Sequence, residues 1–460
     1  MKSFSLVRRS IGLLGPLESL ACTDPVVEGE HRGPSAAVVY GNTRVQLKIA
    51  AIIALSLINL VQIASPLRLN TDATTLLSMA QSAHEGRGFT EEGRKTLLPI
   101  AYPLVVWGLS SAGVACSSGF VALNVIAFAV GLSTFWRIAR SYWNLAGEAA
   151  INAILLTLLS FAAIKHLPIP MTEFVFMALG LLAIERALAS QRSRSHAGLQ
   201  FFLAVTLAML ATAVRTVGVA LFPALLWSAW HTPGLRRRLP TASKLIAILL
   251  VVGAIGAGLL LRTSYFSFTA EHVGFRAWLP AAALARLRDA GELVLNVPYS
   301  RLAFTGGAGL ILMSSIGAVA SIMVGAGFAV RSYAVSTVEV YVFAYAALML
   351  VWPYQDVRFW IPVLPFMVVL AQDGARRLGG RHWQRAAVLY VAMFAATGVT
   401  ALAYSARITL SGSRFADLYG TDDLRATYQT AYGRTVTGRT PAIPRIVALI
   451  DQYDACPSRQ

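Results

Sequence analysis

The sequence predicts an all-α integral membrane protein whose chain crosses the bilayer many times. Of its 460 residues, 56% are hydrophobic and only 13% are charged, and the mean hydropathy is +0.61. The chain therefore has more apolar surface than a water-soluble core could bury. The apolar residues also gather into runs of about 18 to 25, the length of helix that crosses about 30 Å of hydrocarbon. Short basic clusters separate these runs, which is how orientation in the bilayer is encoded.

About eleven runs are expected to span the membrane. They lie near residues 46–66, 116–136, 146–164, 171–188, 198–214, 216–230, 242–262, 304–329, 335–352, 359–371 and 386–405. The net charge of +17 is attributed to membrane orientation and not to nucleic-acid binding, because no basic face carries aromatic stacking residues. With a cytoplasmic N-terminus, every basic cluster falls on the cytoplasmic side: Arg137/Arg140, Arg192/Arg194, Arg236/Arg237/Arg238, Arg331 and Arg376/Arg377/Arg381/Arg385.

Three regions are expected along the chain. Residues 1–44 form a poorly ordered cytoplasmic leader, residues 45–405 a multi-span membrane domain, and residues 406–460 a short tail on the outer face. Within the domain, 67–115 is a first outer loop with juxtamembrane helices, and 263–303 is an outer loop that covers the acceptor side. The apolar stretch 98–113 carries Pro99 and Pro103 and is interpreted as an interfacial helix, since a span there would invert every later loop.

The first outer loop predicts a short helix over 72–85 that lies on the membrane surface. Asn70, Thr71 and Asp72 offer an N-cap, an apolar stripe follows, and Gly86 ends the helix. The role of Asp72 then has two interpretations. An acid in the first turn is stabilised by the helix dipole whatever its function, and a carboxylate beside the membrane can also accept a proton from a hydroxyl nucleophile.

Four segments resemble the polytopic C-type glycosyltransferases, in the order and spacing of that family. TDATTLLSMAQSAHEGRGF with LLPIAYPLVVWG resembles its first outer loop, in which an acid heads a juxtamembrane helix. PIPMTEFVFMALGLLAIERAL resembles its outer-edge helix with an early Glu, and AVRTVGVALFPALL resembles its Arg-bearing turn. YQDVRFWIPVLPFMVVLA resembles its late helix with an Arg-aromatic-x-x-Pro-x-x-Pro pattern. The similarity is to relatives of the aminoarabinose, protein-mannosyl and rhizobial lipopolysaccharide transferases.

The resemblance implies an inverting transferase in the bacterial inner membrane, with its active site on the outer, periplasmic face. Its partners would be a polyprenyl-phosphate sugar donor, a lipid, glycan or protein acceptor, and membrane lipids. Inversion needs one displacement and one base, for which Asp72 is the matching position. Many relatives show two adjacent acids there, whereas this chain reads Thr71-Asp72-Ala73. A metal-binding pair is therefore not expected, although a divalent metal cofactor stays open.

A lipid phosphate that leaves with negative charge needs fixed cations at the bilayer surface. Three basic residues are placed for that role: Arg215, Arg358 and Lys165. The two arginines are preferred over the lysine. Each has an ordinary alternative. Arg215 could pair with Glu173 or Asp356, Arg358 could pair with Asp356, and Lys165 could extend its amine to the interface.

Four further residues are expected around the phosphate site as supporting groups. Glu173 begins an outer-facing helix end, where the dipole favours a carboxylate in any case. Tyr102 is placed to shape the donor groove, and Asp356 to partner Arg358. His166 is interpreted as a neutral turn residue more readily than as a ligand.

The remaining acidic pair and the cysteines carry no expected chemistry. Glu91 and Glu92 lie in an EEGRK turn and are expected to be solvated. Cys22, Cys116 and Cys456 match no metal spacing. Only Cys116 and Cys456 share a face, and free thiols are expected there over a disulfide.

Two other classes of protein fit part of the pattern. A secondary transporter would also have many spans, but it usually has broken helices in two matching halves and ionisable residues near mid-membrane. A lipid-carrier-dependent polysaccharide ligase or polymerase would place its key basic residues in a large late outer loop. Here the ionisable residues gather at one face, and loop 263–303 falls in the middle of the chain.

Overall fold

The fold is known from a computed structural model. It describes residues 36–91, 93, 96, 98–193, 195–232, 275–331, 335–350, 352, 354–380, 383–412 and 444–456. Contacts divide the chain into two units, Met1–Val45 and Gln46–Gln460, and the second is treated below. Residues 1–35 of the expected leader and the whole expected span 242–262 lie outside the described residues.

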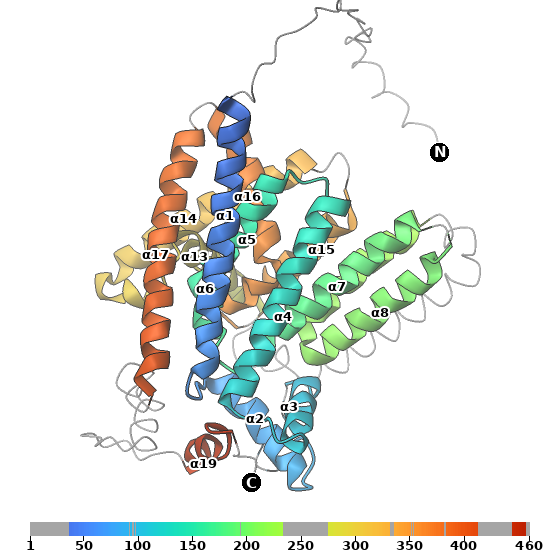
Figure 1. Ribbon diagram of the computed structural model, residues 1–460, viewed down its shortest axis with the longest axis vertical. Coiled ribbons are helices and arrows are strands. Elements are labelled where there is room, and N and C mark those ends of the chain that lie inside the picture. Colours follow the sequence, from blue (N-terminus) through green and yellow to red (C-terminus); the bar gives the residue numbers. More distant parts are fainter. Residues whose placement is uncertain are drawn as a thin grey trace, which may run out of the picture. The chain divides into compact units, whose positions relative to one another are not determined.

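The regular elements of the described residues are helices, without a strand among them (Figure 1). The first half holds α1 Ala36–Val61, η1 Gln62–Ala64, α2 Thr71–His84, α3 Ala101–Ser111, α4 Ser117–Arg137, η2 Ile138–Tyr142, α5 Gly147–Leu158, α6 Phe161–His166, α7 Glu173–Arg192, α8 Ala197–Val214, η3 Thr216–Ala220 and α9 Leu221–His231. The second half holds α13 Phe275–Leu295, η4 Tyr299–Arg301, η5 Ala303–Thr305, α14 Gly307–Arg331, α15 Thr337–Leu350, η7 Val357–Val363, α16 Leu364–Gly379, α17 Trp383–Ser411 and α19 Pro444–Tyr453.

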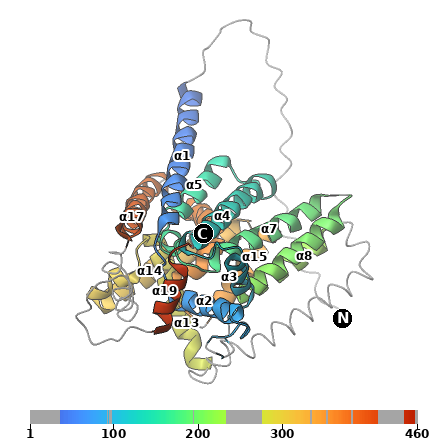
Figure 2. The same cartoon turned by 60° about the horizontal axis from the view of Figure 1, so that its bottom comes forward.

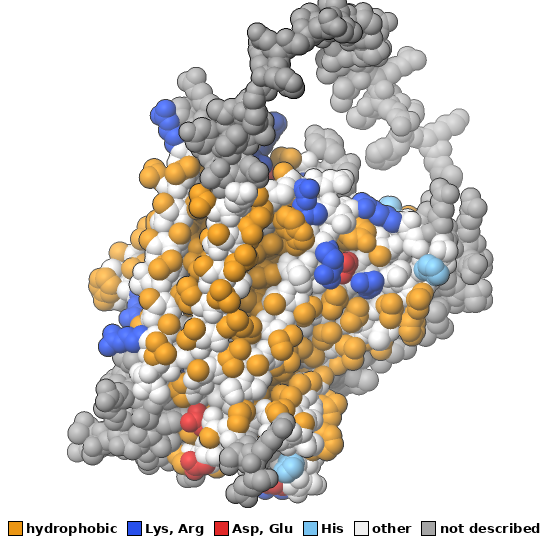
Figure 3. Space-filling model, in the orientation of Figure 1, with side chains coloured by type: hydrophobic (Ala, Val, Ile, Leu, Met, Phe, Trp, Pro, Cys, Tyr) orange, Lys and Arg blue, Asp and Glu red, His pale blue; other side chains and the backbone are white. Residues whose placement is uncertain are grey.

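Six helical stretches of the described chain are long and apolar enough to cross a membrane. They are Val45–Ala64, Ser117–Tyr142, Ala197–Val214, Gly307–Arg331, Val357–Gly379 and Trp383–Ser411. On the face in Figure 3, hydrophobic side chains cover the middle of α1, α4 and α17. Large apolar side chains exposed on these helices include Leu57, Ile126 and Leu389. The chain is thus a polytopic helical membrane protein.

The expected number of eleven spans is not confirmed. Residues 216–230 and 335–352 form apolar helices of fewer than 18 residues, Thr216–His231 and Thr337–Leu350. Helix α7 forms where the span 171–188 is expected, but Glu185 and Arg186 lie within it. The expected span 146–164 is divided into α5 and α6.

The division between α5 and α6 is stabilised by one distant side chain. Asn296, which follows α13 and is 2% exposed, accepts a hydrogen bond from the Phe161 amide (2.7 Å). Its amide group donates to the carbonyls of Leu159 (2.9 Å) and Phe394 (3.1 Å). A buried main chain needs such partners wherever a helix is interrupted. The short helix α6 can therefore turn away from α5 and end at the site.

Helix α14 packs closely against α13 and α16 through glycines. A Cβ at Gly317 would overlap the Leu287 carbonyl of α13, and a Cβ at Gly327 would overlap the Leu370 carbonyl of α16. On the partner helices, Gly291 and Gly374 face α14 in the same way. Small residues let membrane helices approach closely where lipid gives no hydrophobic driving force. These contacts fix α13 against the bundle.

The two ends of the helix bundle carry different features. At one end α4 and α7 are joined by Arg137 and Glu185 (2.7 Å), and α14 and α16 by Arg331 and Asp373 (2.7 Å). At the other end lie α2, α3, the start of α4 and the C-terminal helix α19 (Figures 1 and 2). Of the clusters that are expected to be cytoplasmic, the first end carries Arg137, Arg331 and Arg376, and the second end carries the first outer loop.

Helix α19 is attached to the second end by apolar packing and by a disulfide. Ile446, Leu449 and Ile450 are buried in a core shared with α2 and α3. Cys116 and Cys456 are joined, which corrects the expectation of free thiols. The expectation that Glu91 is solvated is also wrong, because it pairs with Arg445 of α19 (2.7 Å). Both contacts join segments more than 300 residues apart, so local sequence gives no signal for them; Glu92 is outside the described residues.

Candidate active site

Asp72 lies in the first turn of α2, and the helix begins as the sequence predicts. The Asn70 side chain accepts a hydrogen bond from the Ala73 amide (2.8 Å), so Asn70 is the capping residue. The Asp72 carboxylate points elsewhere and accepts a hydrogen bond from Arg358 Nη2 (2.6 Å). Its side chain is 40% exposed. Asp72 therefore combines a fixed orientation with an open side.

Arg358 is the centre of the charged cluster. Its side chain is only 8% exposed and lies near three carboxylates, those of Asp72 (2.6 Å), Asp356 (3.1 Å) and Glu173 (3.5 Å). The Asp356 side chain also accepts a hydrogen bond from the Arg358 amide (3.0 Å), which starts η7. A buried guanidinium is stable only with such partners. The expected pair of Arg358 with Asp356 is present, and Asp72 joins it.

Arg215 extends the cluster from the link between α8 and η3. Its Nη1 lies 2.8 Å from Glu173 Oε1, which corresponds to the ion-pair alternative for this residue. The Phe359 ring contacts both guanidinium groups, with its centroid 4.8 Å from Arg215 Cζ and 5.1 Å from Arg358 Cζ. Glu173 is 1% exposed. Three chain segments, the start of α7, the link before η3 and η7, thus meet around one buried carboxylate and one aromatic ring.

Lys165 and His166 end α6 at the edge of this cluster. Burial lowers the pKa of His166 to about 4, although Asp356 acts against it, so the ring is neutral at pH 7. Its Nδ1 lies 2.8 Å from the Ala162 carbonyl oxygen, which agrees with a neutral turn residue. Lys165 is exposed and forms no ion pair or hydrogen bond with any residue that the structure describes. Of the three expected phosphate-binding cations, Lys165 is thus the one that forms no ion pair with a carboxylate of the described residues, although its charge acts on Asp356 and Glu292.

Asp356 and Tyr102 complete the set of expected supporting residues. Burial would raise the pKa of Asp356, but His166 and Arg358 hold it below its usual value, with a smaller effect of Lys165. Tyr102 is fully buried between α2 and α4, and burial followed by the charge of Glu173 raises the pKa of its hydroxyl. Its hydroxyl has no hydrogen-bond partner among the described residues. The expected supporting residues therefore all lie around the cluster.

Sequence reasoning missed the charged face of α13. Arg286 and Asp289 are buried and paired (2.7 Å), and Arg288 lies near Glu292 (3.6 Å). Burial raises the pKa of Glu292 to about 7. The spacing of these charges, three and four residues apart in LARLRDAGELVL, is the signal that could have identified them. Helix α13, which lies within the expected outer loop 263–303, thus carries a buried ion pair.

The donor groups do not suit a divalent metal. Asp72, Asp356 and Glu173 each face a guanidinium. Among the residues that the structure describes, no group of three or more His, Cys, Asp or Glu side chains could hold an ion. The chemistry below is accordingly assigned to the side chains alone.

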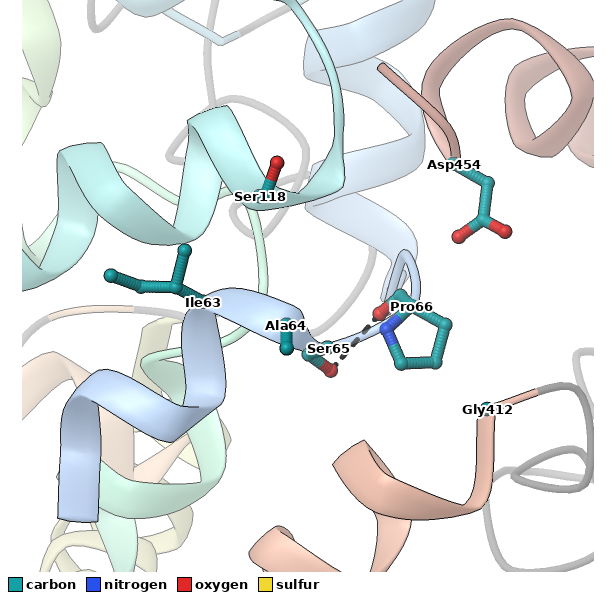
Figure 4. Close-up of a pocket in the computed structure, with 7 residues that line it drawn as sticks. All are labelled: Ile63, Ala64, Ser65, Pro66, Ser118, Gly412 and Asp454. Carbon is teal, nitrogen blue, oxygen red and sulfur yellow. Dashed lines mark hydrogen bonds between the residues drawn. The ribbon is translucent and has the colours of Figure 1, made fainter.

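A separate cavity of about 420 Å³ lies beside the disulfide, away from these charges. Ile63, Ala64, Ser65 and Pro66 line it together with Ser118, Gly412 and Asp454 (Figure 4). The Asp454 carboxylate accepts a hydrogen bond from the Leu67 amide (2.6 Å). Its polar groups hold the chain entering the first outer loop, and none of them belongs to the Arg358 cluster.

Comparisons with known proteins give one structural likeness. No protein-family model matches the chain, and no curated protein sequence matches it. The chain is similar to the crystal structure of ArnT from Cupriavidus metallidurans in the apo state, with a TM-score of 0.47 and 16% sequence identity. The alignment covers 87% of this chain and 69% of that chain.

Proposed function

We propose that this protein is an inverting C-type glycosyltransferase, which moves a sugar from a polyprenyl-phosphate donor to an acceptor on the outer face of the membrane. The observation that carries this proposal is Asp72, whose partly exposed carboxylate is oriented by the buried Arg358. A general base needs access to its substrate and a fixed direction. Asp72 has both.

In the proposed reaction the acceptor hydroxyl gives its proton to Asp72 as its oxygen bonds to the anomeric carbon. The bond between that carbon and the phosphate oxygen breaks on the opposite side, which inverts the anomeric configuration. The electron pair leaves with the lipid phosphate, and Lys165 stabilises the charge that develops there. Arg358 orients the carboxylate of Asp72. Glu173 lies between Arg358 and Arg215 and keeps Arg358 in place.

The disulfide supports placing this chemistry on the outer face. Disulfides persist in oxidising compartments and are rare in the bacterial cytoplasm. Cys116 and Cys456 join the start of α4 to the end of α19, and α19 packs against α2, which carries Asp72. The opposite end of the bundle carries Arg137, Arg331 and Arg376, as the positive-inside rule requires.

One observation favours a transporter as the second candidate function. The interrupted helix pair α5 and α6 ends at the site, and transporters often bind substrates at broken helices. Here the Phe161 amide and the Leu159 carbonyl at the interruption form hydrogen bonds with Asn296, so they are not available to a solute. A glycosyltransferase therefore accounts for more of the described geometry.

The direct test uses the purified protein in lipid nanodiscs. Radiolabelled polyprenyl-phosphate sugars should release polyprenyl phosphate and pass the sugar to a total lipid and glycan extract, whereas nucleotide sugars should not react. Uptake of the same sugars into proteoliposomes is measured in parallel. Uptake without transfer from any lipid-linked sugar would establish the transporter and contradict the proposal.

A further inference from the structure

The charged face of α13 contacts the segment that carries Asp356 and Arg358 into the site. Arg286 is 4% exposed, and its Nη1 donates to Asp289 Oδ2 (2.7 Å) on the same helix. Its Nη2 leaves the helix and donates to the main-chain carbonyls of Trp352 (3.3 Å) and Tyr354. These carbonyls lie between the end of α15 and the start of η7.

This segment determines where the central arginine of the site lies. Two residues after Tyr354, Asp356 begins η7, and two residues later Arg358 reaches Asp72. We propose that Arg286 is a positioning residue of the site, which holds the chain at 352–354 so that Arg358 meets Asp72. The expected effect of Arg286 on catalysis rests on the proposed function. Its expected effect on the position of Arg358 does not.

The residue type fits this task. A guanidinium has five donors in a planar fork and can bond a carboxylate on one side and two carbonyls on another. An ammonium is a point charge, and at this position it could keep the Asp289 pair but not both carbonyls. A pair that only stabilised α13 would need Nη1 and Asp289 alone, since they lie three residues apart on the helix.

The neighbouring Arg288 gives a matched control. It lies on the same helix and is 24% exposed. Its Nη2 donates to the Gln355 side chain (3.2 Å) and lies 3.8 Å from Asp289 Oδ1, and its Nε lies 3.6 Å from Glu292. Among the described residues of 352–356 it donates to no main-chain carbonyl, so its replacement should leave the position of Arg358 unchanged.

Two variants test the hydrogen bonds from Arg286 to the carbonyls of Trp352 and Tyr354. They are Arg286→Lys and the double variant Arg286→Met/Asp289→Leu, and Arg288→Lys is the control. The double variant removes the buried pair as a unit and leaves no unpaired charge, which keeps folding within reach. Hydrogen–deuterium exchange of the whole protein in nanodiscs is followed in peptides covering 352–362, α2 and α7. We expect faster exchange in 352–362 for both variants, no change in α2 and α7, and no change for the control.

The same variants are assayed for sugar transfer as a function of pH. A carboxylate that loses its cationic partner takes up a proton at higher pH. The acid limb of the rate profile should therefore move to higher pH, and kcat should fall by about tenfold to a hundredfold while the donor KM stays within about twofold. Arg288→Lys should show neither change.

The outcomes separate this inference from the proposed function. Unchanged exchange in 352–362, an equal change in all peptides, or failure of both variants to fold would overturn the positioning role. A lower rate without movement of the acid limb would overturn it as well, since that is the result of a purely structural contact. If wild-type protein transfers no sugar, the proposed function fails, and the exchange data still decide the role of Arg286.

Discussion

The charged residues of the site are engaged in different ways, and this assigns them different roles. Arg215 and Arg358 are buried and form ion pairs with carboxylates, whereas Lys165 is exposed and forms no ion pair with a described residue. A guanidinium already neutralised by acids orients those acids and offers less charge to a ligand. The arginines are therefore assigned to holding Asp72 and the lysine to contacting the phosphate, which reverses the order of preference that the sequence suggested.

Replacement of Lys165 should weaken donor binding. In Lys165→Ala we expect the donor KM to rise by about tenfold or more, because a charge-assisted contact to phosphate is lost, and Lys165→Arg should restore most of it. The control is Arg87→Ala, which removes an exposed cation paired with Glu85. Equal kinetics of Lys165→Ala and wild type would exclude the lysine from the donor site.

Glu292 should make stability depend on pH. Burial raises its pKa from 4.5 in the unfolded chain to about 7, so the folded state keeps a proton that the unfolded state has lost. This contribution is fully present below pH 4.5 and is lost as pH rises through 7, by about 3 kcal/mol at most. Glu292→Gln keeps the shape without the charge. Thermal unfolding should show the variant more stable than wild type at pH 8 and equal to it at about pH 4, below the unfolded pKa. An equal difference at both pH values would show that the carboxyl does not titrate as described.

At the scale of elements, local signals predicted local structure. The helix over 72–85 was predictable because its cap, Asn70, and its terminating glycine, Gly86 with φ +76°, lie within the segment. The interruption between α5 and α6 was not predictable, since its partner Asn296 lies 135 residues away. That the candidate residues gather at one end of the bundle could be predicted from the order of the spans, but which acid pairs with which arginine could not. Such pairing depends on the tertiary approach of α2, α7 and η7.

The disulfide should fix α19 to the first outer loop. Cys116→Ser/Cys456→Ser removes a cross-link between residues 340 apart in the chain, which we expect to lower stability by about 2–4 kcal/mol. The apolar face of α19 remains, so the helix should stay bound but be cut earlier by a protease added from the outer side. Cleavage of α19 at the wild-type rate would show that the packing of Ile446, Leu449 and Ile450 suffices.

At the scale of the molecule, both ends of the bundle have a predicted side. Cysteines are introduced in a chain whose Cys22 is replaced by serine, at the exposed Ala448 of α19 and at the exposed Arg377 near the end of α16. A maleimide that cannot cross the membrane should label position 448 in intact spheroplasts. It should label position 377 only after permeabilisation. The reverse pattern would place Asp72 in the cytoplasm and exclude an outer-face active site.

The central claim is that Asp72 accepts the acceptor proton, and its most direct test is single-turnover sugar transfer by Asp72→Asn. We predict a fall in rate of about a hundredfold to ten-thousandfold, with unchanged binding of the lipid-linked donor. The matched control is Glu91→Gln, in which another acid of the same loop loses its pair with an arginine, Arg445. This control should transfer sugar at the wild-type rate. Transfer by folded Asp72→Asn at the wild-type rate would contradict the account.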